Sequence, residues 1–127
     1  MGFFSDLFKS EKNWSYKELA ALSASLITMS AADGVIDDTE QKMVTDALMA
    51  LDDGKIKDWK QFADETTLVP AEKHLQVLKN MHTTKKKLVV GLLACVELAD
   101  GDVHPMEHEF FLNMARQLGV DIKNLRK

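Results

Sequence analysis

The sequence contains one nine-residue stretch twice, as ADGVIDDTE at positions 32–40 and as ADGDVHPME at positions 99–107. Both copies read Ala-Asp-Gly-x5-Glu, and the second copy lies 67 positions after the first. Each copy follows an apolar stretch and precedes a stretch with amphipathic spacing. The repeat predicts two helix hairpins related by an approximate two-fold axis, with the two turns facing each other.

Outward from these turns, apolar residues recur at intervals of three and four, which is the spacing of an α-helix. Leu19, Leu22, Leu26 and Met29 show this spacing before the first turn, and no stretch of the chain alternates at period two. Asp-Gly pairs, prolines and Gly119 interrupt the pattern. We therefore predict an all-α bundle of about seven helices, at 15–32, 38–52, 56–65, 70–82, 84–99, 105–118 and in a short tail after Asp121.

Composition limits the classes of protein that fit. The 127 residues suit one domain, and the net charge of -4 does not provide the basic face that binding of nucleic acid requires. The single cysteine excludes an internal disulfide, and the first residues lead us to expect no signal peptide. The longest apolar stretch, 88–96, is shorter than the roughly 18 residues that span a bilayer. We expect a cytoplasmic protein.

Residues 1–14 are expected to form an N-terminal arm ahead of a helical domain at 15–127. The arm contains three aromatic residues, Phe3, Phe4 and Phe8. They can pack on the bundle, which is the interpretation we favour, or contact the inner face of a membrane. Asp6 occupies the position where a myristoylation motif requires Ser or Thr.

The Asp-Gly-x5-Glu pattern matches the second half of an EF-hand loop, in which the glycine makes the sharp turn and the glutamate binds calcium. The first half is missing. Met29 and Ala31 in the first copy, and Val96 and Leu98 in the second, occupy positions where an EF-hand needs oxygen ligands. A cation site would therefore need carboxylates from both turns.

Helix capping is the alternative explanation of the same residues. Gly34 and Gly101 suit the left-handed turn that ends a helix, Asp37 and Glu40 suit a capping box, and Pro105 suits the first turn of a helix. Taken one at a time, these residues require no ligand.

Capping does not explain Asp33 and Asp100, which lie at predicted helix C-termini. The helix dipole disfavours a carboxylate there by about 0.3 to 1 kcal/mol. Like charges about 5 Å apart repel by about 3 kcal/mol at an effective dielectric near 20, so clustered acids favour a cation or a basic partner. Neither nine-residue copy contains Lys or Arg. The candidate metal ligands are Asp33, Asp37, Glu40, Asp100, Asp102 and Glu107.

The doubled motif, each copy following an apolar helix, resembles the TerB-like family of tellurite-resistance proteins over about residues 15–118. The resemblance implies an all-α fold of about seven helices, a divalent-metal site at the paired turns and a bacterial role in tellurite resistance and stress response. Asp33, Glu40, Asp100 and Glu107 match acidic positions of the family. His104 departs from it, since the family often has another acid there. The resemblance also implies membrane-associated stress-response components as possible partners.

Two functions remain open. The first is a metal-binding stress protein whose cation is Ca²⁺ or Mg²⁺, because the available ligands are oxygens. The second is an adaptor whose acidic turns dock a basic partner without metal.

An enzyme is the least supported class, because the chain has no phosphate loop, nucleophile elbow or Ser-His-Asp arrangement and suggests no small-molecule substrate. Other polar and aromatic residues receive structural interpretations. Cys95, Trp14 and Trp59 are expected to pack in the core. The lysines and histidines are expected on the surface, namely Lys85, Lys86, Lys87, His74, His82, His104 and His108.

The arm gives a first testable prediction. Deleting residues 1–10 should lower the melting temperature, because exposing three aromatic side chains on the arm is unfavourable and their burial would stabilise the bundle. Thermal melting followed by circular dichroism measures this. An unchanged melting temperature together with loss of liposome binding would instead show that the arm contacts a membrane.

Overall fold

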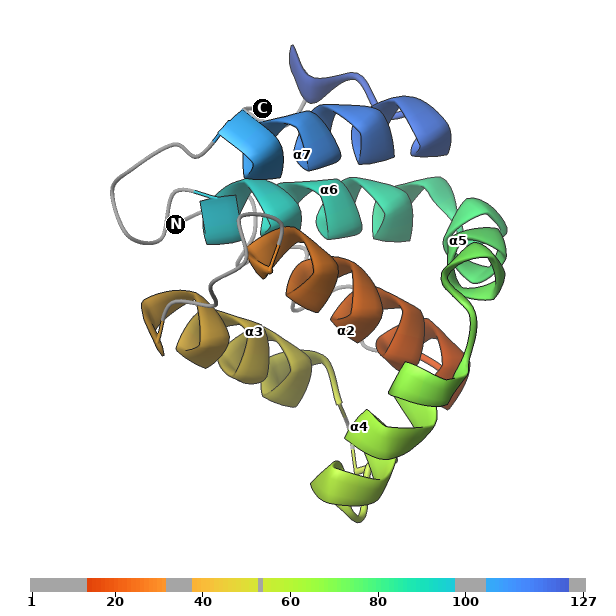
Figure 1. Ribbon diagram of the computed structural model, residues 1–127. Coiled ribbons are helices and arrows are strands. Elements are labelled where there is room, and N and C mark those ends of the chain that lie inside the picture. Colours follow the sequence, from red (N-terminus) through yellow and green to blue (C-terminus); the bar gives the residue numbers. More distant parts are fainter. Residues whose placement is uncertain (1–13, 32–37, 53, 98–104, 124–127) are drawn as a thin grey trace.

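The computed structural model describes residues 14–31, 38–52, 54–97 and 105–123. Within these ranges the chain forms six α-helices and no strand, which confirms the predicted all-α fold (Figure 1). Ile122 and Lys123 add a short 3₁₀ turn in the predicted tail. The helices are α2 (Tyr16–Ser30), α3 (Asp38–Leu51), α4 (Trp59–Leu68), α5 (Ala71–Lys79), α6 (Thr83–Glu97) and α7 (Pro105–Leu118).

The start of α2 is fixed by a capping box. The Ser15 hydroxyl accepts a hydrogen bond from the Glu18 backbone N–H at 3.1 Å, and the Glu18 carboxylate accepts one from the Ser15 N–H at 2.9 Å. Two of the N–H groups that a helix start leaves without a helical partner are thus satisfied.

Helix α4 begins and ends three residues later than the predicted 56–65. The Asp52 carboxylate accepts hydrogen bonds from the N–H groups of Gly54, Lys55 and Ile56, which holds these residues in a turn. Gly54 adopts a φ of 102° in this turn. Asp58 then caps the helix by accepting from the Gln61 N–H at 3.1 Å. Because Asp58 caps the helix, α4 begins at Trp59 and not at residue 56, where apolar spacing predicted its start.

The two halves of the chain have matching helices. Both α2 and α6 contain 15 residues, both α3 and α7 contain 14, and each helix of the second half begins 67 positions after its counterpart. Most of their buried positions match as well. Equivalent pairs of buried apolar residues are Ala21 and Leu88, Leu22 and Val89, Leu26 and Leu93, Met29 and Val96, Val44 and Phe111, Ala47 and Met114, Leu48 and Ala115, and Leu51 and Leu118.

An ion pair joins the two halves at equivalent positions. The Glu18 carboxylate lies 2.9 Å from the Lys85 ammonium, and these residues are 67 positions apart. Under two-fold symmetry only residues near the axis meet their own counterparts, so this contact marks the approximate axis. The Lys85 ammonium also lies 5.3 Å from the centre of the Trp14 ring. The expectation of a fully solvated Lys85 is wrong, since only 13% of its side chain is exposed.

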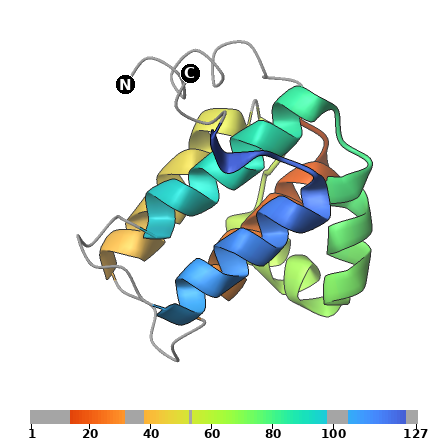
Figure 2. The same cartoon turned by 90° about the horizontal axis from the view of Figure 1, so that it is seen from above.

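Helix α2 is the centre of the bundle and contacts all five other helices (Figures 1 and 2). Trp14 and most apolar residues of α2 and α6 are fully or almost fully buried, whereas Ile27 in α2 is 44% exposed. Trp59 differs from the prediction of a core residue, because 39% of it is exposed while Phe62 in the same helix is buried. Its ring packs on the edge of the core, 5.8 Å from the Phe62 ring. Within the described residues, no helix is long and apolar enough to cross a membrane.

Replacing Glu18 with alanine removes both the ion pair with Lys85 and part of the capping box. We expect the free energy of unfolding to fall by about 1 to 2 kcal/mol. Glu18→Gln keeps a hydrogen-bond acceptor and should lose about half as much. Asp46→Ala is the control, since it breaks an exposed pair with Lys42 and should cost less than about 0.5 kcal/mol. Equal losses in urea denaturation for Glu18→Ala and the control would contradict a structural role for the axial pair.

Candidate functional site

The helix ends that adjoin the two repeated turns lie on one side of the molecule. The ends of α2 and α6 and the starts of α3 and α7 are all at the left of Figure 1, and Figure 2 shows the same grouping. The hairpin arrangement therefore places the four helix ends that adjoin the two acidic segments on one side of the bundle, while the segments themselves, and the prediction that they face each other, lie outside the described residues.

Only part of the predicted ligand set falls within the described residues. Glu107 lies in the first turn of α7. Glu40 lies in α3, and its side chain is outside what the structure describes. The remaining four predicted ligands, Asp33, Asp37, Asp100 and Asp102, lie outside the described residues.

Glu107 is completely buried, with 0% of its surface exposed. A carboxylate in the first turn of a helix interacts favourably with the helix dipole. Burial of a charged group is nevertheless costly without compensating polar contacts or a cation. The glutamate that closes the second copy of the motif is thus held inside the protein, whereas a residue that only improved solubility would be exposed.

A second buried carboxylate, Glu97, precedes the second copy of the motif and was not among the predicted ligands. Glu97 is the last residue of α6 and is 4% exposed. Its Oε1 atom lies 2.6 Å from Nδ1 of His108, whose side chain is 48% exposed. A carboxylate carries no proton, so Nδ1–H of the imidazole donates and Oε1 of Glu97 accepts. A glutamate inside an apolar helix, three positions before Asp100, was the available signal for this residue.

The corresponding positions in the first half are neutral. Glu97 and His108 are the counterparts of Ser30 and Gln41 at the same spacing of 67. Ser30 is 1% exposed, and its hydroxyl has no hydrogen-bond partner within the described residues. The two turns are therefore flanked differently, with a buried carboxylate beside the second turn and a buried hydroxyl beside the first.

The part of the chain that the structure describes contains no group of three or more His, Cys, Asp or Glu side chains able to hold a metal ion. This finding covers the described residues only, which do not include four of the predicted ligands or the side chain of Glu40. The expectation that the histidines lie on the surface is wrong for His74, which is 6% exposed. It holds for His82, which is exposed.

Within the described residues the fold defines a class: an all-α protein of two matching helix hairpins whose helix ends next to the acidic segments lie on one side. A family model, described as tellurite resistance protein TerB, matches residues 19–127. The chain therefore belongs to the TerB family, and the resemblance found in the sequence is confirmed. It is a TerB-like, tellurite-resistance-associated domain, and the family is generally non-enzymatic. No curated protein and no solved structure matches the chain.

Cys95 gives a prediction about reactivity. It is half-buried in α6, and burial raises the pKa of its thiol. A raised pKa lowers the thiolate fraction at pH 7, and the thiolate is the reactive form. We expect iodoacetamide to modify Cys95 about tenfold more slowly in the native protein than in urea, with the native rate rising only at higher pH. A native rate at pH 7 equal to that in urea would contradict this.

Proposed function

We propose that this chain is a non-enzymatic protein that binds a divalent cation through its two acidic turns and serves tellurite resistance and stress response in the bacterial cytoplasm. The observation that supports it is the burial of two carboxylates, Glu97 and Glu107, on the helices that flank the second turn. Buried carboxylates are retained where a cation or a polar network compensates their charge.

The donor chemistry fits a hard cation. The candidate ligands Asp33, Asp37, Glu40, Asp100, Asp102 and Glu107 offer carboxylate oxygens, which Ca²⁺ and Mg²⁺ prefer. A bound cation would offset the mutual repulsion of these groups. Glu97 adds a carboxylate beside the second turn, and the hydrogen bond from His108 holds its orientation.

The second candidate function is an adaptor. Neither copy of the motif contains a basic residue, so the same end of the bundle suits a basic segment of a partner protein, including a membrane-associated stress component. This function needs no metal and differs from the first in one measurable property, the response of the isolated protein to divalent ions.

Calorimetric titration with Ca²⁺, Mg²⁺, Mn²⁺ and Zn²⁺ tests the metal hypothesis. We expect about one Ca²⁺ or Mg²⁺ per chain and a higher melting temperature, since ligand at about 100 times Kd stabilises by about 2.7 kcal/mol. If one ion is shared, Asp33→Asn and Asp100→Asn should each weaken binding strongly, whereas two independent sites would each lose half the stoichiometry. Without metal, each variant should be slightly more stable than the wild type because repulsion is relieved.

Asp64→Asn is the matched control, because Asp64 is an exposed acid on α4 and should leave binding unchanged. Wild-type protein without heat of binding and without a melting shift for any of the four ions would eliminate the metal hypothesis. The adaptor would then remain, and capture of a Lys- and Arg-rich peptide by the wild type but not by the two Asp→Asn variants would support it.

A further inference from the structure

A cavity of about 400 Å³ lies between α2, α4 and α5. Its α2 wall is formed by Tyr16, Lys17 and Ala20, all in the first two turns of that helix. Ala20 lies ten positions before Ser30, the last residue of α2, which corresponds to about 15 Å along a helix. The cavity is therefore separate from the proposed cation site, and its volume is within the range of small-molecule pockets.

Apolar side chains form part of the cavity wall. Ala20 is almost fully buried, Val77 is half-buried, and Val69 is 39% exposed at the end of α4. These three residues belong to or adjoin three different helices, so a ligand between them would contact every side of the cavity. Burial of an apolar group in this space is favourable.

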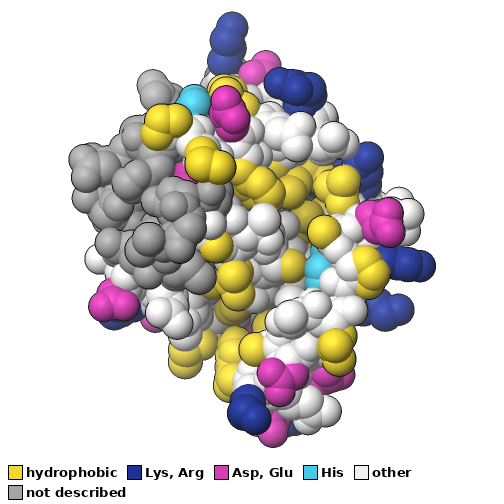
Figure 3. Space-filling model, in the orientation of Figure 1, with side chains coloured by type: hydrophobic (Ala, Val, Ile, Leu, Met, Phe, Trp, Pro, Cys, Tyr) yellow, Lys and Arg dark blue, Asp and Glu magenta, His cyan; other side chains and the backbone are white. Residues whose placement is uncertain are grey.

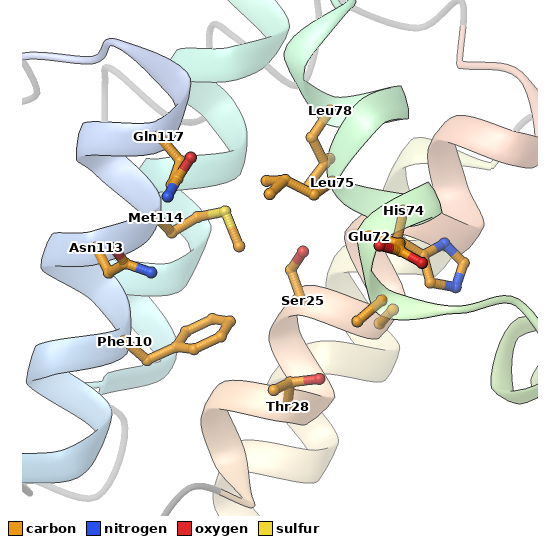
Figure 4. A pocket seen from close by; sticks show the side chains of 12 residues that line it. Ser25, Thr28, Glu72, His74, Leu75, Leu78, Phe110, Asn113, Met114 and Gln117 are labelled. Carbon is orange, nitrogen blue, oxygen red and sulfur yellow. The ribbon is translucent and has the colours of Figure 1, made fainter.

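His74 forms a fixed part of the wall. Its Nε2 atom lies 2.9 Å from the Thr66 carbonyl oxygen, and because a carbonyl only accepts, Nε2 carries the proton. Figure 4 shows the His74 ring pointing away from α7, and the hydrogen bond joins it to α4. The contact holds α4 and α5 together at the cavity, so the space is largely preformed.

The polar groups of the cavity favour an acceptor on the ligand. The Thr66 hydroxyl is buried without a hydrogen-bond partner among the described residues, and the amides of Gln76 and Asn80 can donate. Lys17 and Lys73 are two cations on different helices that line the same cavity. A carboxylate would meet donors and positive charge here.

Glu65 is the one acidic residue that lines the cavity, and it already has a donor. The Tyr16 hydroxyl lies 3.0 Å from its Oε1 atom. Desolvation, followed by the hydrogen bond to Glu65, raises the pKa of Tyr16, so the hydroxyl keeps its proton at neutral pH and continues to donate. The lining thus carries one more positive than negative charge, although the whole chain carries a net charge of -4.

A second groove has no lysine in its lining. It has a volume of about 230 Å³ between α2, α5 and α7, where Phe110 and Met114 face Leu75 and Ser25 (Figure 4). Figure 3 shows hydrophobic side chains gathered across the middle of this face, with charged side chains toward its edges. Glu72 is its single charged lining residue, and nothing in the structure indicates what would cover it.

We propose that the cavity between α2, α4 and α5 binds a small amphipathic carboxylate. The apolar part of the ligand packs on Ala20, Val69 and Val77, and its carboxylate lies between Lys17 and Lys73. No sequence motif indicates this small-molecule site, because its lining residues come from three separate segments of the chain. The site is independent of the divalent cation and can be tested without it.

The experiment compares octanoate, octanol and octylammonium by amide chemical shifts of ¹⁵N-labelled protein in the absence of divalent ions. We expect saturable shifts with octanoate at the start of α2, the end of α4 and along α5, and about fivefold weaker binding of octanol, which lacks the charge. Octylammonium should bind more weakly still, because the two lysines repel it.

Lys17→Gln and Lys73→Gln should each weaken octanoate binding about fivefold and leave octanol binding unchanged. Lys79→Gln is the matched control, since Lys79 is exposed on α5 and does not line the cavity. Equal affinity for all three probes, shifts confined to α7 or no saturable shifts would each overturn the proposal. Octanoate binding that the control variant weakens as much as Lys73→Gln would also overturn it, since a general loss of charge would then explain the effect.

Discussion

The burial of α2 and α6 is the constraint on which the rest of the structure depends. Both helices are apolar on most of their surface, so neither hairpin can cover its own central helix. Packing the hairpins together, with α4 and α5 also packed against α2, covers both helices, and many equivalent positions are buried in each half. The Glu18 and Lys85 pair at the junction adds a directional contact, which favours one alignment of the halves over others of similar apolar area.

This packing has an electrostatic consequence at one end of the bundle. Once the hairpins align, the helix ends that adjoin both acidic segments lie on the same side, and the buried carboxylates Glu97 and Glu107 belong to two of these ends. Glu97 is placed at a helix C-terminus, where the dipole opposes its charge, and is buried as well. Such an arrangement is not needed to bury the core, which is why we connect it with function.

Sequence spacing predicted the fold well because helix periodicity and the repeat are both local patterns. The boundaries of α3 and α7 agree with the expected ranges to within one residue. The errors came from side-chain hydrogen bonds and ion pairs, which apolar spacing does not reveal. The turn that Asp52 stabilises shifts the start of α4 to a later residue. The hydrogen bond to the Thr66 carbonyl keeps His74 buried, and the ion pair with Glu18 keeps most of the Lys85 side chain buried. The burial of Glu97 escaped notice for the same reason, since its partner His108 lies in another helix.

The two halves show that the repeat serves folding and that the departures from it serve other purposes. At many buried apolar positions a change in one half keeps its apolar character, as with Leu48 and Ala115, whereas the buried Leu19 and Ala20 of the first half correspond to Lys86 and Lys87 of the second. At the end of the central helices the change from Ser30 to Glu97 introduces a charge at a buried position, which packing alone would disfavour. The cavity lining is likewise confined to one half and the helices between the halves, since it uses α2, α4 and α5. Residues at one end of the bundle, and residues on the side of α2 that faces α4 and α5, can therefore differ between the halves without altering the fold.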